Sequence, residues 1–446
     1  MSTLVVADKK QNKYFLDTLA EYVEASGIGI YSFLNLSIGL FKSLTEFHQT
    51  VILRLLGTKG VHLDDILVQD PAKKEEIEKI LINKFRLIVK FTGSGGPVLY
   101  KLEDNFLNSL RIYFSSGLKL IFPYNISKSD NTATFIAKFE EKSKKHGFEK
   151  WNSMHRAMLT GNTKDLPMNV KKALEDANLV MSNERNNSTC FDFLLDSLKN
   201  QVNWFLYAYN ARLVKTRQNY LRVDTKESEA VNPNRILNFL YHLALLSPQL
   251  SYKLKDSSSA ILENQLTPEL VFTILKDLNF VGLMRLKEPD TAQDQNAKPL
   301  MFAPTPLLYN IFNTNVSLEH GFKNQIIVES DFTVYAYSNN LEYLEALLNL
   351  FTRVKFKMPT LIVCIIDDES ISRAFKSGIK PKQILSYLNS NIHREVRKNK
   401  THHMSEEEIK SADIKYSFLP ENVVKQFEIW HDECIINPDF GKIGDR

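Results

Sequence analysis

Asp367, Asp368 and Glu369 form the densest group of carboxylates in the chain. Carboxylates can act as general acids and bases or bind metal ions, but both uses need side chains that converge from separate elements. Three consecutive acids at the start of a helix point in different directions, and they stabilise the positive end of the helix dipole. Helix capping therefore explains this cluster better than a hydrolase or metal site does.

The other residues that could do chemistry are scattered. His402 and His403 lie in a polar stretch beside lysines, which favours solvated side chains over zinc ligands. The glycine turn GSGGP at 93–97 could cradle a phosphate, but a P-loop needs Gly-Lys-Ser/Thr before a helix, and here Pro97 and a strand follow. The basic run REVRKNK at 394–400 could touch phosphates or acidic partners, although such a run is more often a solvated surface.

The three cysteines, Cys190, Cys364 and Cys434, are too far apart for a paired zinc or disulfide pattern. They favour a reducing compartment, either cytosol or nucleus. No catalytic motif such as His-Glu-x-x-His or Gly-x-Ser-x-Gly occurs. We therefore expect no catalytic residues, no metal and no cofactor, and we interpret the chain as a non-enzyme.

Composition narrows the class of protein further. A net charge of +4 over 446 residues gives no case for a strongly basic nucleic-acid binder. The N-terminal apolar run is short and charges follow at once, so we expect neither a signal peptide nor a membrane anchor. The most apolar stretch, 28–41, is shorter than the ~20 residues that a membrane span needs, and we predict a buried helix there.

The pattern of apolar residues, prolines and glycines predicts a mostly α chain with small β-hairpins (α+β), and these elements must position the residues named above. Two β-rich runs flank the glycine turn at 93–97 and predict a hairpin after a helical region. A long amphipathic helix is predicted over 190–209, and Pro233 and Pro268 mark helix starts, with Thr267 as an N-cap. The segment after Gly282 predicts strand, loop, strand. Helices closed by hairpins suggest tandem winged-helix-like units.

This pattern predicts four domains: an N-terminal helical, winged-helix-like region at 1–125, a second winged-helix-like unit at 145–228, a third at 229–318, and a small mixed α/β domain at 319–446. In the last domain we predict a polar loop near 393–415.

The last domain opens with a predicted strand over 326–340 that carries alternating aromatics. A helix at 341–354 follows, and then MPTLIVCIID, which predicts a strand or a buried linker. Two short helices come next, joined by a turn at Gly378, which suits the C′ position, and Pro381 suits the first position of the second helix.

Three segments of this domain resemble the TFIIH core subunit four family, the roughly 52-kilodalton subunit that holds the XPB-type translocase. VESDFTVYAYS at 328–338 is similar to that family's acidic and aromatic strand. ESISRAFKSGIKPKQILSYL at 369–388 resembles its glycine-turned helix pair, and LPENVVKQFEIW at 419–430 resembles its closing helix. Looser likeness extends the resemblance over about 150–432.

The resemblance implies a non-catalytic scaffold of TFIIH, located in the nucleus. Its winged-helix-like units would contact other core subunits. Its last domain, called the clutch, would pair with a similarly folded domain of the translocase. This pairing would stimulate the translocase's ATPase for RNA polymerase II promoter opening and nucleotide excision repair. DNA would be contacted at most indirectly, and no membrane would be involved.

Two positions depart from the family pattern. Asp368 stands where the family commonly has arginine, so a charge pair made by that arginine does not carry over. Sixteen residues follow Trp430, where the family usually continues into a module that binds the smallest TFIIH subunit. Binding to that subunit therefore does not carry over from the resemblance.

The opening strand of the clutch offers candidate partner-binding residues. Its edge, with Phe332, Val334 and Tyr335 and the nearby Tyr337, could lie at the docking surface. The competing interpretation is that Phe332 and Val334 are core residues on one face and Tyr335 and Tyr337 lie on the other. Alternation alone does not decide between these interpretations.

The helix pair adds further candidates. Arg373 and the turn Gly378, Ile379 and Lys380 could offer charge and hydrogen-bond donors to a partner. The alternative function is a stand-alone winged-helix DNA-binding transcription regulator, with an independent enzyme as a third hypothesis. A DNA binder would show steep salt dependence with duplex DNA.

Overall fold

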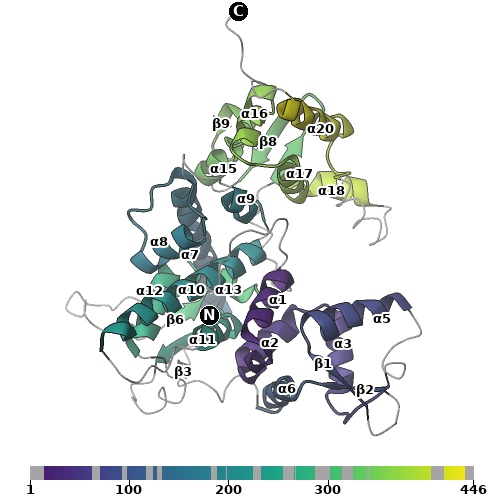
Figure 1. Ribbon diagram of the computed structural model, residues 1–446. Coiled ribbons are helices and arrows are strands. Elements are labelled where there is room, and N and C mark those ends of the chain that lie inside the picture. Colours follow the sequence, from purple (N-terminus) through teal and green to yellow (C-terminus); the bar gives the residue numbers. More distant parts are fainter. Residues whose placement is uncertain are drawn as a thin grey trace, which may run out of the picture. The chain divides into compact units, whose positions relative to one another are not determined.

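A computed structural model describes most of the chain (Figure 1). The residues that it describes are 15–62, 71–92, 98–116, 124–127, 133–181, 188–196, 198–224, 233–254, 266, 268–286, 302–313, 325–338, 341–402 and 416–436. They form mostly helices with small antiparallel sheets, which confirms the predicted fold class. The glycine turn at 93–97 and the predicted N-cap Thr267 lie outside the described residues.

The chain groups into two compact units, each built from two separate stretches. Unit 1 combines Met1–Lys144 with Val202–Val316, and unit 2 combines Lys145–Gln201 with Ser317–Arg446. Helices α7 (Ala133–Thr160) and α10 (Leu198–Asp224) carry residues of both units. The division into four domains and the winged-helix character of three of them remain predictions. Among the described residues, no helix combines the length and apolar character that a membrane crossing requires.

The remaining helices of unit 1 are short. They are α1 (Phe15–Ser26), the 3-10 helix η1 (Ile28–Ser32), α2 (Leu34–Ser43), α3 (Glu46–Leu55), α5 (Pro71–Ile77), the π-helix η2 (Glu78–Lys84), α6 (Asp104–Ser116), α11 (Pro233–Leu245), α12 (Pro268–Phe280) and α13 (Pro306–Tyr309). Prolines at the first positions of α11 and α12 agree with the predicted helix starts, because proline lacks only a donor that a first turn leaves unused.

Residues 34–41 of the apolar stretch at 28–41 are buried, but the stretch is not one helix as predicted. Phe33 is extended, with φ −88° and ψ 107°, and separates η1 from α2. The carbonyl of Tyr31 accepts hydrogen bonds from the hydroxyls of Ser37 and Ser109. Helix α2 then packs against α11 so closely that a Cβ at Gly39 would lie 2.8 Å from the rings of Tyr241 and Phe312.

The hairpin predicted around the glycine turn is confirmed. Strands β1 (Ile88–Thr92) and β2 (Val98–Leu102) pair antiparallel, with Lys90 opposite Tyr100. Val61 adds an isolated antiparallel bridge to Tyr100, so a third segment borders this hairpin. A helix, a bridge, a helix and a hairpin follow one another here, and the winged-helix character of this region remains a prediction.

A second sheet of unit 1 joins segments that are far apart in the sequence. Its strand order is β3 (Tyr124–Ser127), β4 (Ser251–Leu254), β6 (Phe302–Pro304) and β5 (Met284–Leu286), all antiparallel. The predicted strand, loop, strand after Gly282 corresponds to β5 and β6. No signal in the sequence indicated that β3, which crosses the end of the first predicted domain at residue 125, would join this sheet.

Unit 2 contains a four-stranded antiparallel sheet in the order β7 (Gln325–Val328), β8 (Thr333–Tyr337), β10 (Leu361–Ile365) and β9 (Arg353–Met358). Its helices, apart from the parts of α7 and α10, are α8 (Met168–Asp176), α9 (Ser188–Leu194), α15 (Leu341–Leu348), α16 (Asp368–Lys376), α17 (Pro381–Ser390), α18 (Arg394–Thr401) and α20 (Glu421–Ile436). Helix α15 contacts β9 and β10.

The single strand predicted over 326–340 is wrong, because the chain reverses within it to form the hairpin β7–β8. The carboxylate of Asp331 accepts a hydrogen bond from the amide of Thr333 at 2.9 Å, and Phe332 takes φ +66°. Aspartate side chains that bind the backbone two residues on are typical of turns. The Ser-Asp pair at 330–331 was the overlooked turn signal.

Two further segments differ from their predictions. The helix predicted over 190–209 is broken between α9 and α10, where the Gln201 amide donates to the carbonyls of Leu194 and Asp196, both at 3.1 Å. Residues 394–401, predicted as part of the polar loop near 393–415, form α18. Its first turn is capped by His393, whose ring nitrogen accepts from the amide of Glu395. Residues 403–415 lie outside the described residues.

Candidate partner-docking surface

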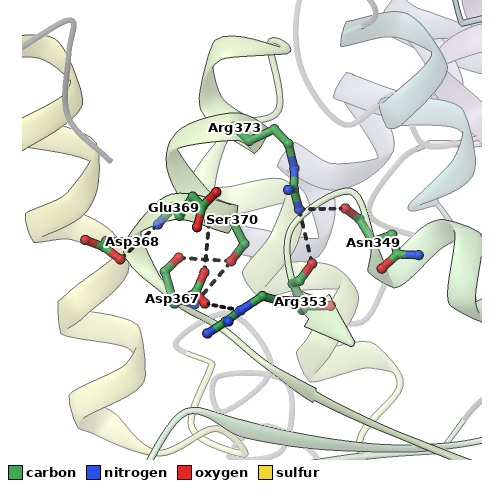
Figure 2. Close-up of polar contacts among 8 residues, drawn as sticks. Asn349, Arg353, Asp367, Asp368, Glu369, Ser370 and Arg373 are labelled. Carbon is green, nitrogen blue, oxygen red and sulfur yellow. Dashed lines mark hydrogen bonds and ion pairs between the residues drawn. The ribbon is translucent and has the colours of Figure 1, made fainter. Parts of the chain in front are cut away.

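Asp367 caps helix α16, as predicted, and Asp368 and Glu369 lie in its first turn (Figure 2). Asp367 Oδ1 accepts from the amide of Ser370 at 2.9 Å, and Ser370 Oγ accepts from the amide of Asp367 at 3.1 Å. Arg353 Nε donates to Asp367 Oδ2 at 2.8 Å. Burial alone would raise the pKa of the Asp367 carboxyl, but the hydrogen bonds from Ser370 and Arg353 outweigh it and hold the pKa below its usual value.

Arg373, predicted to meet a partner, makes contacts within unit 2. Its guanidinium donates to the carbonyl oxygens of Asn349 at 3.0 Å and Thr352 at 3.2 Å (Figure 2). These carbonyls follow the end of α15, so Arg373 ties α16 to the turn before β9. The side chain is exposed, and its role towards a partner remains a prediction.

The predicted turn after α16 has the expected geometry. Gly378 lies at φ +93°, and the amide of Ile379 donates to the carbonyl of Ala374, which satisfies the end of the helix. The side chain of Ile379 is only 3% exposed and belongs to the core. Lys380 is exposed, and its amide donates to Gln383, which in turn contacts Asp192 of α9. Of these three residues, Lys380 offers a partner the most side-chain surface.

Val334 lies in the interior, whereas Phe332 is half-buried. The ring of Phe332 lies in the β7–β8 turn, 5.6 Å from the ring of Trp430 in α20. Val334 is fully buried and pairs with Cys364, which is also buried. We call the buried face of the sheet the inner face; its residues are Ile326, Val334, Ala336, Ile362 and Cys364. The core interpretation therefore accounts for Val334 without a partner.

Tyr335 and Tyr337 lie on the opposite face, as strand alternation requires. The register places Tyr335 in one row with Ile327, Val363 and Phe356, and Tyr337 in the next row with Leu361 and Met358. We call these seven residues the outer face. Phe356 is 64% exposed, Met358 47% and Tyr337 37%. Large exposed apolar side chains gathered on one surface are typical of a protein interaction site.

The two edges of this sheet differ. On the β7 side, the amide of Ile326 donates to the carbonyl of Asn391 and the amide of His393 donates to the carbonyl of Ile326, both at 2.7 Å. Strand β8 lies inside the sheet, between β7 and β10. The predicted opening strand thus has its main chain bonded on both sides. Strand β9 forms the other edge, and its side chains are mostly exposed.

The basic run at 394–400 is used largely within unit 2. The Lys400 ammonium donates to the carbonyls of Ser417 and Phe418, and the Arg397 guanidinium lies 4.5 Å from the centre of the Phe418 ring. Lys398 contacts Glu395 one turn earlier. This arrangement agrees with the solvated-surface interpretation and does not favour a phosphate site.

Strand β9 was not predicted from the sequence, and its exposed residues Phe356 and Met358 were therefore not among the candidate docking residues. Apolar Val354, Phe356 and Met358 alternate there with Lys355 and Lys357, which is a strand signal. That signal was overlooked because the strand prediction was centred on the apolar run after Pro359. Among the described residues, no group of three or more histidine, cysteine or acidic side chains is placed to hold a metal ion.

Comparisons with known proteins come from a family model and from curated relatives. The model of the transcription factor Tfb2 matches residues 19–394. A relative from Arabidopsis thaliana named "General transcription and DNA repair factor IIH subunit TFB2" is 23% identical, over 94% of this chain and 84% of its own length. Relatives with the same name are 23% identical in Kluyveromyces lactis, over 94% of this chain and 85% of theirs, and 32% identical in Saccharomyces cerevisiae, over 25% and 23%.

Proposed function

We propose a function that proceeds from one fact: the chain belongs to the Tfb2 transcription factor family, whose model matches residues 19–394. We propose that it is a non-catalytic subunit of the general transcription and DNA repair factor IIH and works in the nucleus. The relatives' printed names, which describe those proteins as subunits of this factor, support the assignment. Other subunits of the same factor are then its partners.

The finer proposal concerns the clutch. We propose that residues 319–446 anchor the XPB-type translocase and stimulate its ATPase, which opens promoter DNA and serves nucleotide excision repair. The observation that carries this proposal is the exposed outer face, with Phe356, Met358 and Tyr337 on one side of a folded sheet. Aromatic and methionine side chains are enriched in protein interfaces, where they exclude water from a central patch.

The chemistry of the outer face fits a regulator rather than an enzyme. Its seven residues are apolar or tyrosine, and Gln325, which pairs with Tyr337 across β7 and β8, is neutral. Such a surface binds by burying apolar area at roughly 25 cal/mol per Å². Any effect on ATP hydrolysis would then act through the active site of the bound translocase.

The test measures the DNA-dependent ATPase rate of the cognate XPB-type translocase, with and without the full chain. We expect stimulation by the wild-type chain and a large loss of stimulation and co-elution with Tyr337→Glu. The matched control is Ile429→Glu, because Ile429 is 48% exposed on α20 of the same unit but lies off the sheet. Equal stimulation by the two variants would remove the outer face from the proposal.

The alternative, a stand-alone DNA-binding regulator, has less support. On the first predicted winged-helix-like unit, Lys90 contacts Glu78 and Lys101 contacts Asp104, each at 3.0 Å. These cations of the hairpin are therefore already paired with carboxylates. Tight duplex binding by the chain alone, weakening steeply with salt through counterion release, would favour the alternative over the scaffold.

A further inference from the structure

The edge strand of the unit 2 sheet offers main-chain groups that translocase docking on the outer face does not use, although Phe356 and Met358 of this strand also belong to the outer face. Strand β9 is six residues long and, among the residues that the structure describes, lies at the end of the strand order, while the opposite edge is bonded to residues 391–393. In an antiparallel pair, alternate residues point their N–H and C=O groups away from the neighbouring strand. An exposed edge of this kind is a template for another extended chain.

The side chains of β9 decide what kind of chain fits. Apolar Phe356 and Met358 alternate with Lys355 and Lys357, and Arg353 begins the strand. The register shifts between Val363 and Cys364, so Lys355 is the extra residue of a β-bulge. Bulges re-aim a side chain, and Lys355 is exposed. Arg353 and Lys357 also contact Asp367 and Glu345 of the same unit.

This charge pattern argues against a second copy of the chain as the occupant. Two β9 strands paired antiparallel would bring the cations Arg353, Lys355 and Lys357 of one copy opposite those of the other. Like charges that face one another across strands are destabilising, and lysines on an edge strand guard against such self-pairing. Because Arg353 and Lys357 already contact Asp367 and Glu345, the exposed Lys355 is the cation of β9 that favours an incoming strand with carboxylates.

We propose that β9 binds an extended acidic segment of another protein, which adds a fifth strand to the sheet. The main chain of the segment pairs with the outward N–H and C=O groups of β9. A carboxylate of the segment lies near Lys355, and its apolar residues, alternating with the acidic ones, cover Phe356 and Met358. Binding by strand addition takes its affinity from main-chain hydrogen bonds and its specificity from alternate side chains.

The test uses the full chain and a fluorescent peptide of the same length as β9, in which valine and glutamate alternate. Fluorescence anisotropy should show binding, weakened about fivefold or more by Lys355→Glu, since the charge reversal replaces an attraction with a repulsion. The control Lys382→Glu alters an exposed lysine of α17 in the same unit and should leave binding unchanged. Hydrogen exchange of the β9 amides should slow when the peptide is bound.

A second peptide separates strand addition from simple charge attraction. N-methylation of alternate residues removes the N–H donors that face β9 without changing charge, and it should abolish binding. Equal binding of the methylated peptide, or equal binding by Lys355→Glu, overturns the proposal. So does wild-type dimerisation through β9, a preference for duplex DNA over the peptide, or no peptide binding at all. None of these results bears on translocase stimulation, so the two proposals fail separately.

Discussion

The inner and outer faces of the β7–β8–β10–β9 sheet use the same strands in opposite ways. On the inner face, Ile326, Val334, Ala336, Ile362 and Cys364 are all fully buried. On the outer face, Phe356 is 64% exposed and Met358 is 47% exposed. Both faces are apolar, so polarity does not separate core from surface in this sheet. The packing of helices separates the two faces instead, because α15 contacts β9 and β10 while Phe356 stays exposed.

The largest expected effect is on the inner face. Val334→Asp would bury a carboxylate among apolar side chains without a partner, and we expect it to lower the free energy of unfolding by about 4 kcal/mol. Urea unfolding followed by tryptophan fluorescence measures this loss. Tyr337→Asp is the matched control on the outer face and should cost far less. A similar loss for both variants would contradict the assignment of the two faces.

A second effect comes from the core of unit 2. His155 of α7 is fully buried against the rings of Trp151, Phe193 and Tyr343, and burial lowers its pKa to about 3. Between pH 6.5 and about 3 the unfolded chain therefore binds a proton that the folded chain does not, and stability falls as the pH drops. His155→Leu removes this loss.

The measurement compares His155→Leu with wild type at pH 7.5 and pH 5. The variant's stability relative to wild type should rise by about 2 kcal/mol on going to the lower pH. A difference that does not change with pH would show that His155 takes up its proton in the folded chain as readily as in the unfolded one.

A smaller effect is expected where β10 leads into α16. Because the Asp367 pKa is lowered on folding, the carboxylate stabilises the folded chain above the ordinary aspartate pKa, and this stabilisation is lost as pH falls through the folded pKa. Asp367→Ala should cost about 1 kcal/mol at pH 7 and less near pH 2. Asp367→Asn keeps an acceptor for the Ser370 amide and should cost less than alanine. Thermal unfolding at both pH values checks the order.

The smallest expected effect on the free energy of unfolding is on the outer face. Phe356→Ser removes the most exposed residue of the outer face, and we expect it to change the free energy of unfolding by less than about 0.5 kcal/mol. Urea unfolding under the same conditions as for Val334→Asp provides the comparison. A loss of several kcal/mol would place Phe356 in a packed core and remove it from the docking surface.

Local signals in the sequence predicted much of the fold. The cap at Asp367, the glycine turn at Gly378, the proline start of α17 and the β1–β2 hairpin all follow from residues within a few positions of one another. The sheet of unit 1 shows the limit, because β3 and β4 are more than a hundred residues apart and carry no local sign that they pair. Strand pairing over such a separation depends on tertiary packing, which alternation within one strand does not reveal.

By itself the sequence determined the mostly helical class, the caps and turns, and the motifs that resemble the Tfb2 family, because these depend on residue types at short spacing. Only the tertiary structure decided which of the candidate docking residues reach the surface. Val334 and Ile379 are buried, Phe332 packs on Trp430, and Tyr337 joins Phe356 and Met358 on an exposed face. The physical reason is that alternation assigns side chains to two faces, whereas helices and segments distant in sequence determine which face is covered.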